Sequence, residues 1–275
     1  MGANFLRQCV MNSMGSGSES AGLSNWPQSG QTMAMAEKPA LTPIAAYDTF
    51  APFYSGYAGA RMPYLRRVED IVITHIPRAG SLLDVGAGDG IRAVRIARSA
   101  NMRRVVLLEP SAGMRAQCPA TDIEIWPYSA SEIPETAEQF DVITCLWNVL
   151  GHLEGPQQRA SALVRFRKML APQGMVFLDV SHRYNAQSYG WSMTFLRMVG
   201  DLFLRSEKRG DVAVTWKAGE QIIRTTGHVF THREIKRLVC AAGLKILRRY
   251  IISYETGRVS KLPFRGHLLY QLARA

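Results

Sequence analysis

Long apolar runs and paired cysteines are both missing from this chain of 275 residues. No apolar run approaches the ~20 residues of a membrane-spanning helix, so the sequence predicts no membrane span. The four cysteines are scattered, with neither a C-x-x-C pair nor a zinc-ligand spacing, which indicates free thiols in a reducing, cytoplasmic compartment. The patterns H-E-x-x-H and G-x-S-x-G are absent as well. These absences argue against a disulfide scaffold, a metal-dependent enzyme and a serine hydrolase.

Charge is distributed unevenly along the chain. The net charge is +11, but residues 41–150 carry ten Lys/Arg against twelve Asp/Glu, whereas residues 151–275 carry twenty-one against eight. A basic half is typical of a chain that meets an anionic substrate, nucleic acid or an acidic surface, and it also fits a solvated basic face. Residues 1–40 are rich in Ser, Gly, Met and Gln without apolar periodicity, which predicts a disordered segment ahead of one domain over 41–275.

A glycine-rich stretch, SLLDVGAGDG, occupies residues 81–90. Its apolar start predicts a buried strand, and the helix-forming run IRAVRIARSA follows the glycines. Glycine permits positive φ and lets a ligand approach the backbone closely. Nineteen residues after Gly90, the apolar strand RRVVLLE ends in Glu109, where a carboxylate at the carboxyl tip of a neighbouring strand can hold a ribose diol. The glycine-rich loop and Glu109 together predict a nucleoside-binding crevice.

The spacing of the glycines decides which nucleoside is favoured. The dinucleotide pattern G-x-G-x-x-G requires a third glycine where this chain has Ile91. Asp84 and Asp89 beside the loop would repel a pyrophosphate and suit a cationic ligand. LDVGAGDG with an acid 19 residues further on resembles motif I and the following acidic position of the class I S-adenosylmethionine-dependent methyltransferases.

This resemblance implies an α/β fold with S-adenosylmethionine as cofactor. The expected architecture is a Rossmann-like, doubly wound, seven-stranded and mostly parallel sheet with an antiparallel last strand. Residues 41–79 would form an N-terminal lid, in which an aromatic ring meets the sulfonium through a cation–π contact or simply staples a helix to the sheet. Residues 186–230, a helix and a hairpin around Gly219, would form an insertion that caps the substrate pocket.

The resemblance also implies a set of cofactor contacts. The carbonyl of Leu146, at the end of the strand FDVITCL, would accept from the methionine amino group. Ser129-Ala130 stands where the family usually has Asp-Ala, which weakens or replaces one adenine contact. The implied cofactor-binding residues are Tyr47, Asp84, Gly86, Ala87, Gly88, Asp89, Glu109, Pro110, Met114, Ser129, Ala130, Leu146 and Trp147.

Methyl transfer needs alignment, exclusion of water and, for a hydroxyl or ammonium acceptor, a base. His152 and His182 are the candidate bases and Tyr184 is a third, while Asn148, Arg183 and Tyr184 are candidate substrate contacts. Structural alternatives are a helix cap for Asn148 and an ordinary core role for His152.

The sequence therefore favours methyl transfer to an N or O nucleophile of a small, anionic metabolite. The alternatives are an RNA methyltransferase that uses the basic half, and a cofactor-binding protein without transfer activity. No metal is expected, and the oligomeric state is left open.

Overall fold

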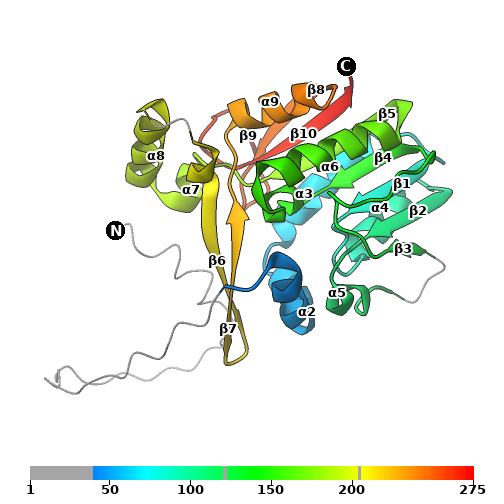
Figure 1. Ribbon diagram of the computed structural model, residues 1–275, viewed down its shortest axis with the longest axis horizontal. Coiled ribbons are helices and arrows are strands. Elements are labelled where there is room, and N and C mark those ends of the chain that lie inside the picture. Colours follow the sequence, from blue (N-terminus) through cyan, green and yellow to red (C-terminus); the bar gives the residue numbers. More distant parts are fainter. Residues whose placement is uncertain (1–39, 120–122, 204–205) are drawn as a thin grey trace, which may run out of the picture.

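The computed structural model describes residues 40–119, 123–203 and 206–275, so the disorder predicted for residues 1–40 falls almost wholly outside the described chain (Figure 1). Its centre is one sheet with the strand order β3-β2-β1-β4-β5-β10-β8-β9. The strands are β1 (Ser81–Val85), β2 (Arg104–Leu108), β3 (Glu124–Trp126), β4 (Phe140–Cys145), β5 (Leu170–Val180), β8 (Leu244–Ile252), β9 (Val259–Ser260) and β10 (His267–Arg274).

The pairing confirms the predicted mostly parallel sheet. Strands β1 to β5 pair in parallel, and β10 runs antiparallel between β5 and β8. The two-residue strand β9 adds an eighth member at the edge beside β8. Strand β5 continues through residues 172–174, where its pairing with β4 skips from Leu170 to Met175. Leu82, Leu83 and Val85 are fully buried, as an apolar run covered on both faces of a parallel sheet should be.

Helices cover both faces of the sheet. One core cluster joins it to α3 (Met62–His75) and α4 (Ile91–Ser99), and another joins it to α6 (Gly155–Met169) and α9 (His232–Ala241). Helix α9 begins with a capping box, since the side chains of Thr231 and Glu234 each accept from the other residue's backbone N–H. Short helices α5 (Ala112–Arg115) and η1 (Val149–His152) follow β2 and β4.

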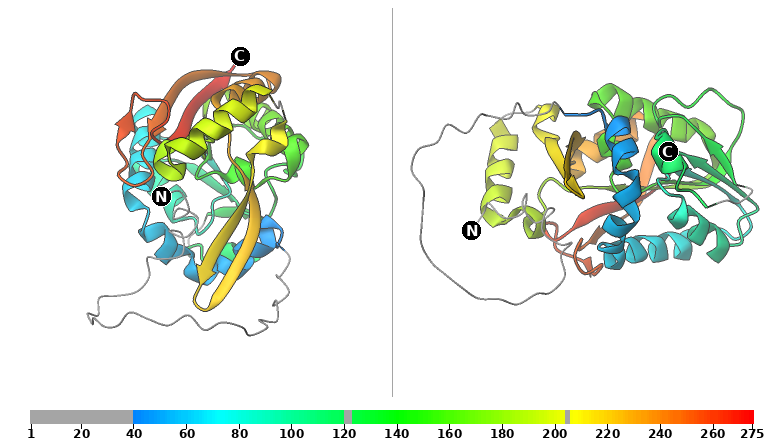
Figure 2. Two further views of the ribbon diagram at one scale, coloured as in Figure 1. Left: turned by 90° about the vertical axis from the view of Figure 1, so that its left-hand side faces the viewer. Right: turned by 90° about the horizontal axis from the view of Figure 1, so that it is seen from below.

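The segments predicted as lid and insertion are packed against each other. Helix α2 (Pro43–Gly59) lies beside the hairpin of β6 (Asp211–Ala218) and β7 (Gln221–His228), which turns at Gly219 with φ of 61° (Figures 1 and 2). Trp216 of β6 stacks on Phe50 of α2 with ring centroids 4.7 Å apart. The rest of the insertion is α7 (Ala186–Tyr189), α8 (Trp191–Phe203) and η2 (Glu207–Gly210), at the outer edge of the molecule (Figure 1).

Candidate active site

The loop after β1 requires glycine for steric reasons. Gly86, Gly88 and Gly90 have φ of 67°, 61° and 69°. A Cβ atom at Gly86 would lie 2.4 Å from a methyl carbon of Val149, and one at Gly88 would lie 3.0 Å from the Tyr54 hydroxyl. The loop backbone therefore lies close to the side chains of Val149 in η1 and Tyr54 in α2, an approach that only glycine permits.

Glu109 at the tip of β2 is fixed in orientation by backbone groups. Its Oε2 accepts from the Gly88 N–H at 2.8 Å and its Oε1 accepts from the Ser111 N–H at 2.9 Å. The side chain is buried, and that burial raises the pKa of Glu109 to about 7. Each oxygen of an ionised carboxylate keeps a further acceptor site, so two hydroxyl groups can still be bound.

A cavity of about 300 Å³ lies at these strand ends, beneath α2. Nine of the predicted cofactor residues line it: Tyr47, Gly86, Gly88, Glu109, Pro110, Ser129, Ala130, Leu146 and Trp147. His152 lines it as well, and so does Tyr54, an aromatic residue of the expected lid. Arg92 and Ser111, which were not predicted as site residues, also line it. The cavity occupies the carboxyl ends of parallel strands, where this class of sheet binds its ligands.

The four remaining predicted cofactor residues lie behind the cavity wall. Asp84 is buried and accepts from the Thr144 hydroxyl at 2.6 Å, while Asp89 accepts from the Ile91 N–H at 3.2 Å. Ala87 and Met114 are buried too, and the Met114 methyl would touch a Cβ atom at Gly88. These side chains support the loop instead of lining the cavity.

Arg92 is the main site residue that sequence reasoning missed. It is 8% exposed, lines the cavity, and its Nε has no hydrogen-bond partner among the described residues. The buried groups around it include Tyr54, Asp84 and Glu69, whose combined effect outweighs desolvation and raises the pKa of Arg92. The only sequence signal was a base in the first turn after the glycine loop. A buried guanidinium with free donor capacity is suited to a carboxylate ligand.

Tyr47 and His152 form a pair in the opposite part of the wall. The Tyr47 hydroxyl lies 3.2 Å from Nε2 of His152, and the two rings meet edge to face. The imidazole is partly exposed, but it is exposed to the cavity, and burial among protein atoms lowers the pKa of His152 to about 4. Burial also raises the pKa of Tyr47. At neutral pH the phenol is thus protonated and the imidazole is neutral.

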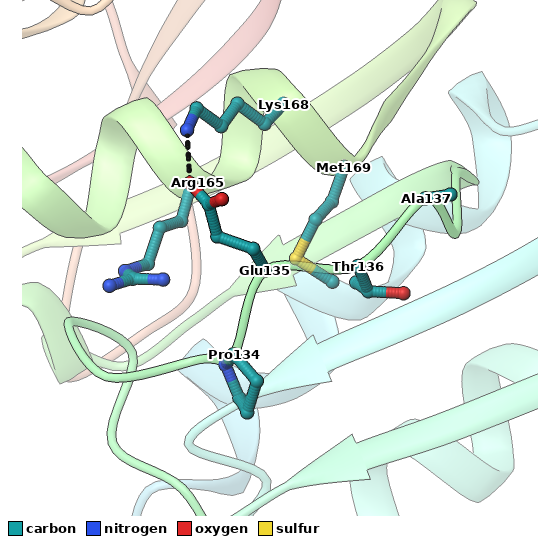
Figure 3. A pocket seen from close by; sticks show the side chains of 7 residues that line it. All are labelled: Pro134, Glu135, Thr136, Ala137, Arg165, Lys168 and Met169. Atoms are coloured by element: carbon teal, nitrogen blue, oxygen red, sulfur yellow. Dashed lines mark hydrogen bonds and ion pairs between the residues drawn. The ribbon is translucent and has the colours of Figure 1, made fainter.

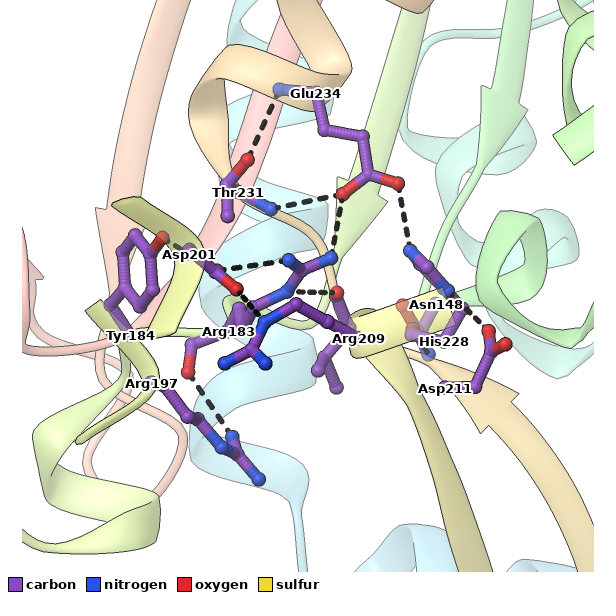
Figure 4. Close-up of polar contacts among 11 residues, drawn as sticks. Asn148, Arg183, Tyr184, Arg197, Asp201, Arg209, Asp211, His228, Thr231 and Glu234 are labelled. Carbon is purple, nitrogen blue, oxygen red and sulfur yellow. Dashed lines mark hydrogen bonds and ion pairs between the residues drawn. The ribbon is translucent and has the colours of Figure 1, made fainter. Parts of the chain in front are cut away.

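The other predicted catalytic and substrate residues do not line this cavity, and Figure 4 shows the polar contacts of Asn148, Arg183 and Tyr184. Arg183 is buried and forms ion pairs of 3.0 Å with both Asp201 and Glu234. The Tyr184 hydroxyl donates to Asp201 at 2.7 Å. His182 is buried just after the end of β5, where it forms a β-bridge with Phe230 and its backbone N–H donates to Nδ1 of His267.

Asn148 also braces the chain. Its side-chain amide donates to the His228 carbonyl at 3.2 Å, and its Oδ1 accepts from the Ser181 N–H at 2.9 Å (Figure 4). Together with Arg183 and Tyr184, it belongs to a network that joins the insertion to β5 and α9.

A second hollow, beside α6, contains none of the predicted site residues (Figure 3). Its volume is about 460 Å³, and Lys168 spans it to Glu135 at 2.7 Å. Both of these side chains are well exposed, so this hollow offers no desolvated polar group to a ligand. In the described part of the chain, no three His, Cys, Asp or Glu side chains are grouped to hold a metal ion, and no helix is long and apolar enough to cross a membrane.

Comparison with known proteins identifies the fold around this cavity. A family model described as a methyltransferase domain matches residues 60–249. The chain belongs to the class I S-adenosylmethionine-dependent methyltransferases. A curated relative, dTDP-3-amino-3,6-dideoxy-alpha-D-glucopyranose N,N-dimethyltransferase of Streptomyces fradiae, is 30% identical over 127 residues, which are 45% of this chain and 49% of the relative. The methyltransferase thus spans about half the length of that relative.

Solved structures share the fold over most of the methyltransferase. The CcbJ methyltransferase of Streptomyces caelestis has a TM-score of 0.61 at 13% identity, covering 84% of this chain and 98% of its own. CalS10, an amino pentose methyltransferase of Micromonospora echinaspora solved with S-adenosylmethionine bound, has a TM-score of 0.54 at 18% identity. The match covers 82% of this chain and 96% of CalS10.

The residues of the cavity match the groups that the family's cofactor carries. Glu109 offers a fixed carboxylate to a ribose diol, and Arg92 offers unpaired donors to a carboxylate. The aromatic faces of Tyr47 and Tyr54 suit a sulfonium. Gly86 and Gly88 let the loop pass close to Val149 and Tyr54, where a Cβ atom would clash, and both glycines line the cavity.

Proposed function

We propose that this methyltransferase transfers a methyl group from S-adenosylmethionine to an amine nitrogen of a small molecule. The charge of the cavity wall is the observation that carries the proposal. Its charged lining residues are Arg92 with Glu109, Glu132 and Glu154, one cation against three carboxylates. If Arg92 and Glu109 hold the cofactor, Glu132 and Glu154 remain as negative charges in the cavity wall. They attract an ammonium and repel a phosphate.

The cofactor would be held at its two polar ends. Glu109 would accept from the ribose hydroxyls, and Arg92 would donate to the methionine carboxylate. Between these ends, Tyr47 and Tyr54 of α2 would cover the cavity and exclude water from the methyl group.

The Tyr47–His152 pair would accept the proton that leaves the amine nitrogen. When bound, S-adenosylmethionine supplies an electrophilic methyl group, and its sulfur keeps the electron pair of the broken bond. An amine must present its lone pair to form the new C–N bond, and the proton it loses passes to His152, directly or through the Tyr47 hydroxyl. The imidazole is neutral and so has a lone pair that can accept a proton, and the 3.2 Å contact connects it to the Tyr47 hydroxyl.

The relatives support an amine acceptor. The curated relative is named for dimethylating an amino sugar nucleotide, and one structural neighbour is named for an amino pentose. The basic half of the chain favours an anionic substrate. An amine acceptor fits this expectation only if its negative group stays outside the cavity, as in an amine that carries a phosphate at its other end.

A labelled-methyl assay tests the proposal. The protein is incubated with methyl-labelled S-adenosylmethionine and, separately, with a metabolite extract, a panel of amino sugar nucleotides and bulk RNA. We expect label in an amine-bearing small molecule. Label in RNA alone would support the RNA alternative, and cofactor binding without transfer to any acceptor would support a binding protein without activity.

A further inference from the structure

Helix α8 has its polar and apolar faces reversed with respect to the protein. Thr194, Arg197 and Asp201, spaced three and four residues apart, face inward. Trp191, Phe195, Leu196, Leu202 and Phe203 face outward and are 61% to 80% exposed. A surface helix of a globular protein normally buries its apolar stripe, so this orientation needs a cause.

Specific polar bonds hold the inward face (Figure 4). Asp201 accepts from Arg183 at 3.0 Å, from Arg209 at 2.6 Å and from the Tyr184 hydroxyl at 2.7 Å. Arg197 donates to the Arg183 carbonyl at 3.1 Å and stacks on Tyr189. Because Arg183 is buried, rotating the helix would remove one of its two carboxylate partners and leave it paired with Glu234 alone. The exposure of the apolar face is therefore built into the fold.

Basic side chains border this apolar face. Lys208 follows the helix, and Lys261 and Arg265 flank Phe264, whose ring meets that of Trp191 at 6.1 Å. All three bases are exposed, and none forms an ion pair with a described residue. Residues 186–210 and 253–266 together contain seven Lys/Arg and three Asp/Glu.

We propose that the apolar face of α8 docks on a lipid membrane with anionic headgroups. An amphipathic helix with Trp, Phe and Leu on one side and bases beside them inserts its apolar side at the headgroup boundary. With 13 residues, α8 is roughly 20 Å long, too short to span a bilayer but suited to lie in its surface. Its position at the outer edge of the molecule leaves it accessible to a flat surface (Figures 1 and 2).

The charges favour a lipid surface over a second copy of the chain. A two-fold contact through α8 would place the same surface on both sides and bring two basic borders together. An anionic headgroup layer attracts those bases, at about 1 kcal/mol for each Lys or Arg near the surface.

Vesicle co-sedimentation tests this docking. The full chain is mixed with vesicles of phosphatidylcholine alone or of equal parts phosphatidylcholine and phosphatidylglycerol. We expect sedimentation with the anionic vesicles, weakened by salt, and little with the neutral ones. The double variant Phe195→Ser/Leu202→Ser should partition on the order of tenfold less, because two large apolar side chains no longer leave water. Lys261→Glu/Arg265→Glu should reduce binding to the anionic vesicles as well.

A matched control removes apolar side chains elsewhere. Val164→Ser/Leu247→Ser changes two exposed apolar residues of α6 and β8 and should sediment like the unmodified chain. Circular dichroism melting confirms that each variant is folded. The proposal is overturned if the chain stays in the supernatant with anionic vesicles, or if Phe195→Ser/Leu202→Ser partitions normally. It is equally overturned if the free chain is a dimer that this variant converts to a monomer, since the face would then belong to a second copy.

Discussion

At the scale of single residues, the proposed role of Glu109 predicts that cofactor binding depends on pH. Its pKa of about 7 means that the carboxyl is largely protonated below neutrality, and a protonated carboxyl attracts a cationic ligand less. We expect cofactor affinity to rise with pH through about 7. Glu109→Gln should weaken binding by about 1.5–3 kcal/mol and flatten this pH dependence. Calorimetry at several pH values measures both; an unchanged affinity would remove Glu109 from the site.

Arg92 gives a second prediction at this scale. Arg92→Met should lower cofactor affinity by about 1.5–3 kcal/mol, because the methionine carboxylate would lose charge-assisted hydrogen bonds. Arg95→Met is the control on the same helix, since Arg95 pairs with Glu69 and does not line the cavity. Equal losses in the two variants would mean that Arg92 acts through the fold and not through the ligand.

At the scale of elements, the β6–β7 hairpin supports the lid instead of lining the cavity. Trp216 packs against both Tyr47 and Phe50, while no lining residue of the cavity comes from residues 186–230. Leu41 and Thr225 tie the start of α2 to β7. The insertion therefore reaches the site through α2.

Trp216→Ala tests this coupling. Removing the buried indole should lower the free energy of unfolding by about 3–5 kcal/mol and also weaken cofactor binding, because Tyr47 loses its backing. Denaturant unfolding and calorimetry on the same sample separate the two effects. A destabilised variant with normal cofactor affinity would show that the hairpin stabilises the fold without positioning the lid.

At the scale of the whole molecule, a buried histidine makes the stability of the fold depend on pH. Burial lowers the pKa of His182 to about 4, below its ordinary value of 6.5. A depressed histidine pKa stabilises the fold fully above pH 6.5, and this contribution is lost as pH falls toward 4. Lowering the pH from 7 to 4.5 should therefore reduce the free energy of unfolding of His182→Gln by about 2 kcal/mol less than that of the unmodified chain. Denaturant unfolding of both proteins at both pH values checks this. An equal loss of unfolding free energy in the variant and the unmodified chain would contradict it.

The sequence allowed prediction of those parts of the site that depend on local geometry. The glycine loop and Glu109 were predictable because positive φ and a strand-end carboxylate are short-range requirements. Arg92 was not, because it is buried among groups that are distant in the sequence, among them Tyr54 and Asp179. His182 and Arg183 were expected at the crevice, yet the chain after β5 pairs with Phe230 and turns toward the insertion.

The same distinction holds for α8. Its amphipathic pattern predicted the helix, but which face turned inward was decided by Arg183 and Glu234, far apart in the sequence. Long-range ion pairs of this kind leave no periodic signal.

The most direct test of the account compares an amine with its hydroxyl counterpart. Single-turnover transfer of labelled methyl is measured on an amino sugar nucleotide and on the same sugar bearing a hydroxyl, with the unmodified chain and with His152→Asn. We predict transfer to the amine alone, slowed by about 10²–10⁴-fold in His152→Asn at unchanged cofactor affinity. Equal transfer to both acceptors, or an unaffected rate in His152→Asn, would contradict it.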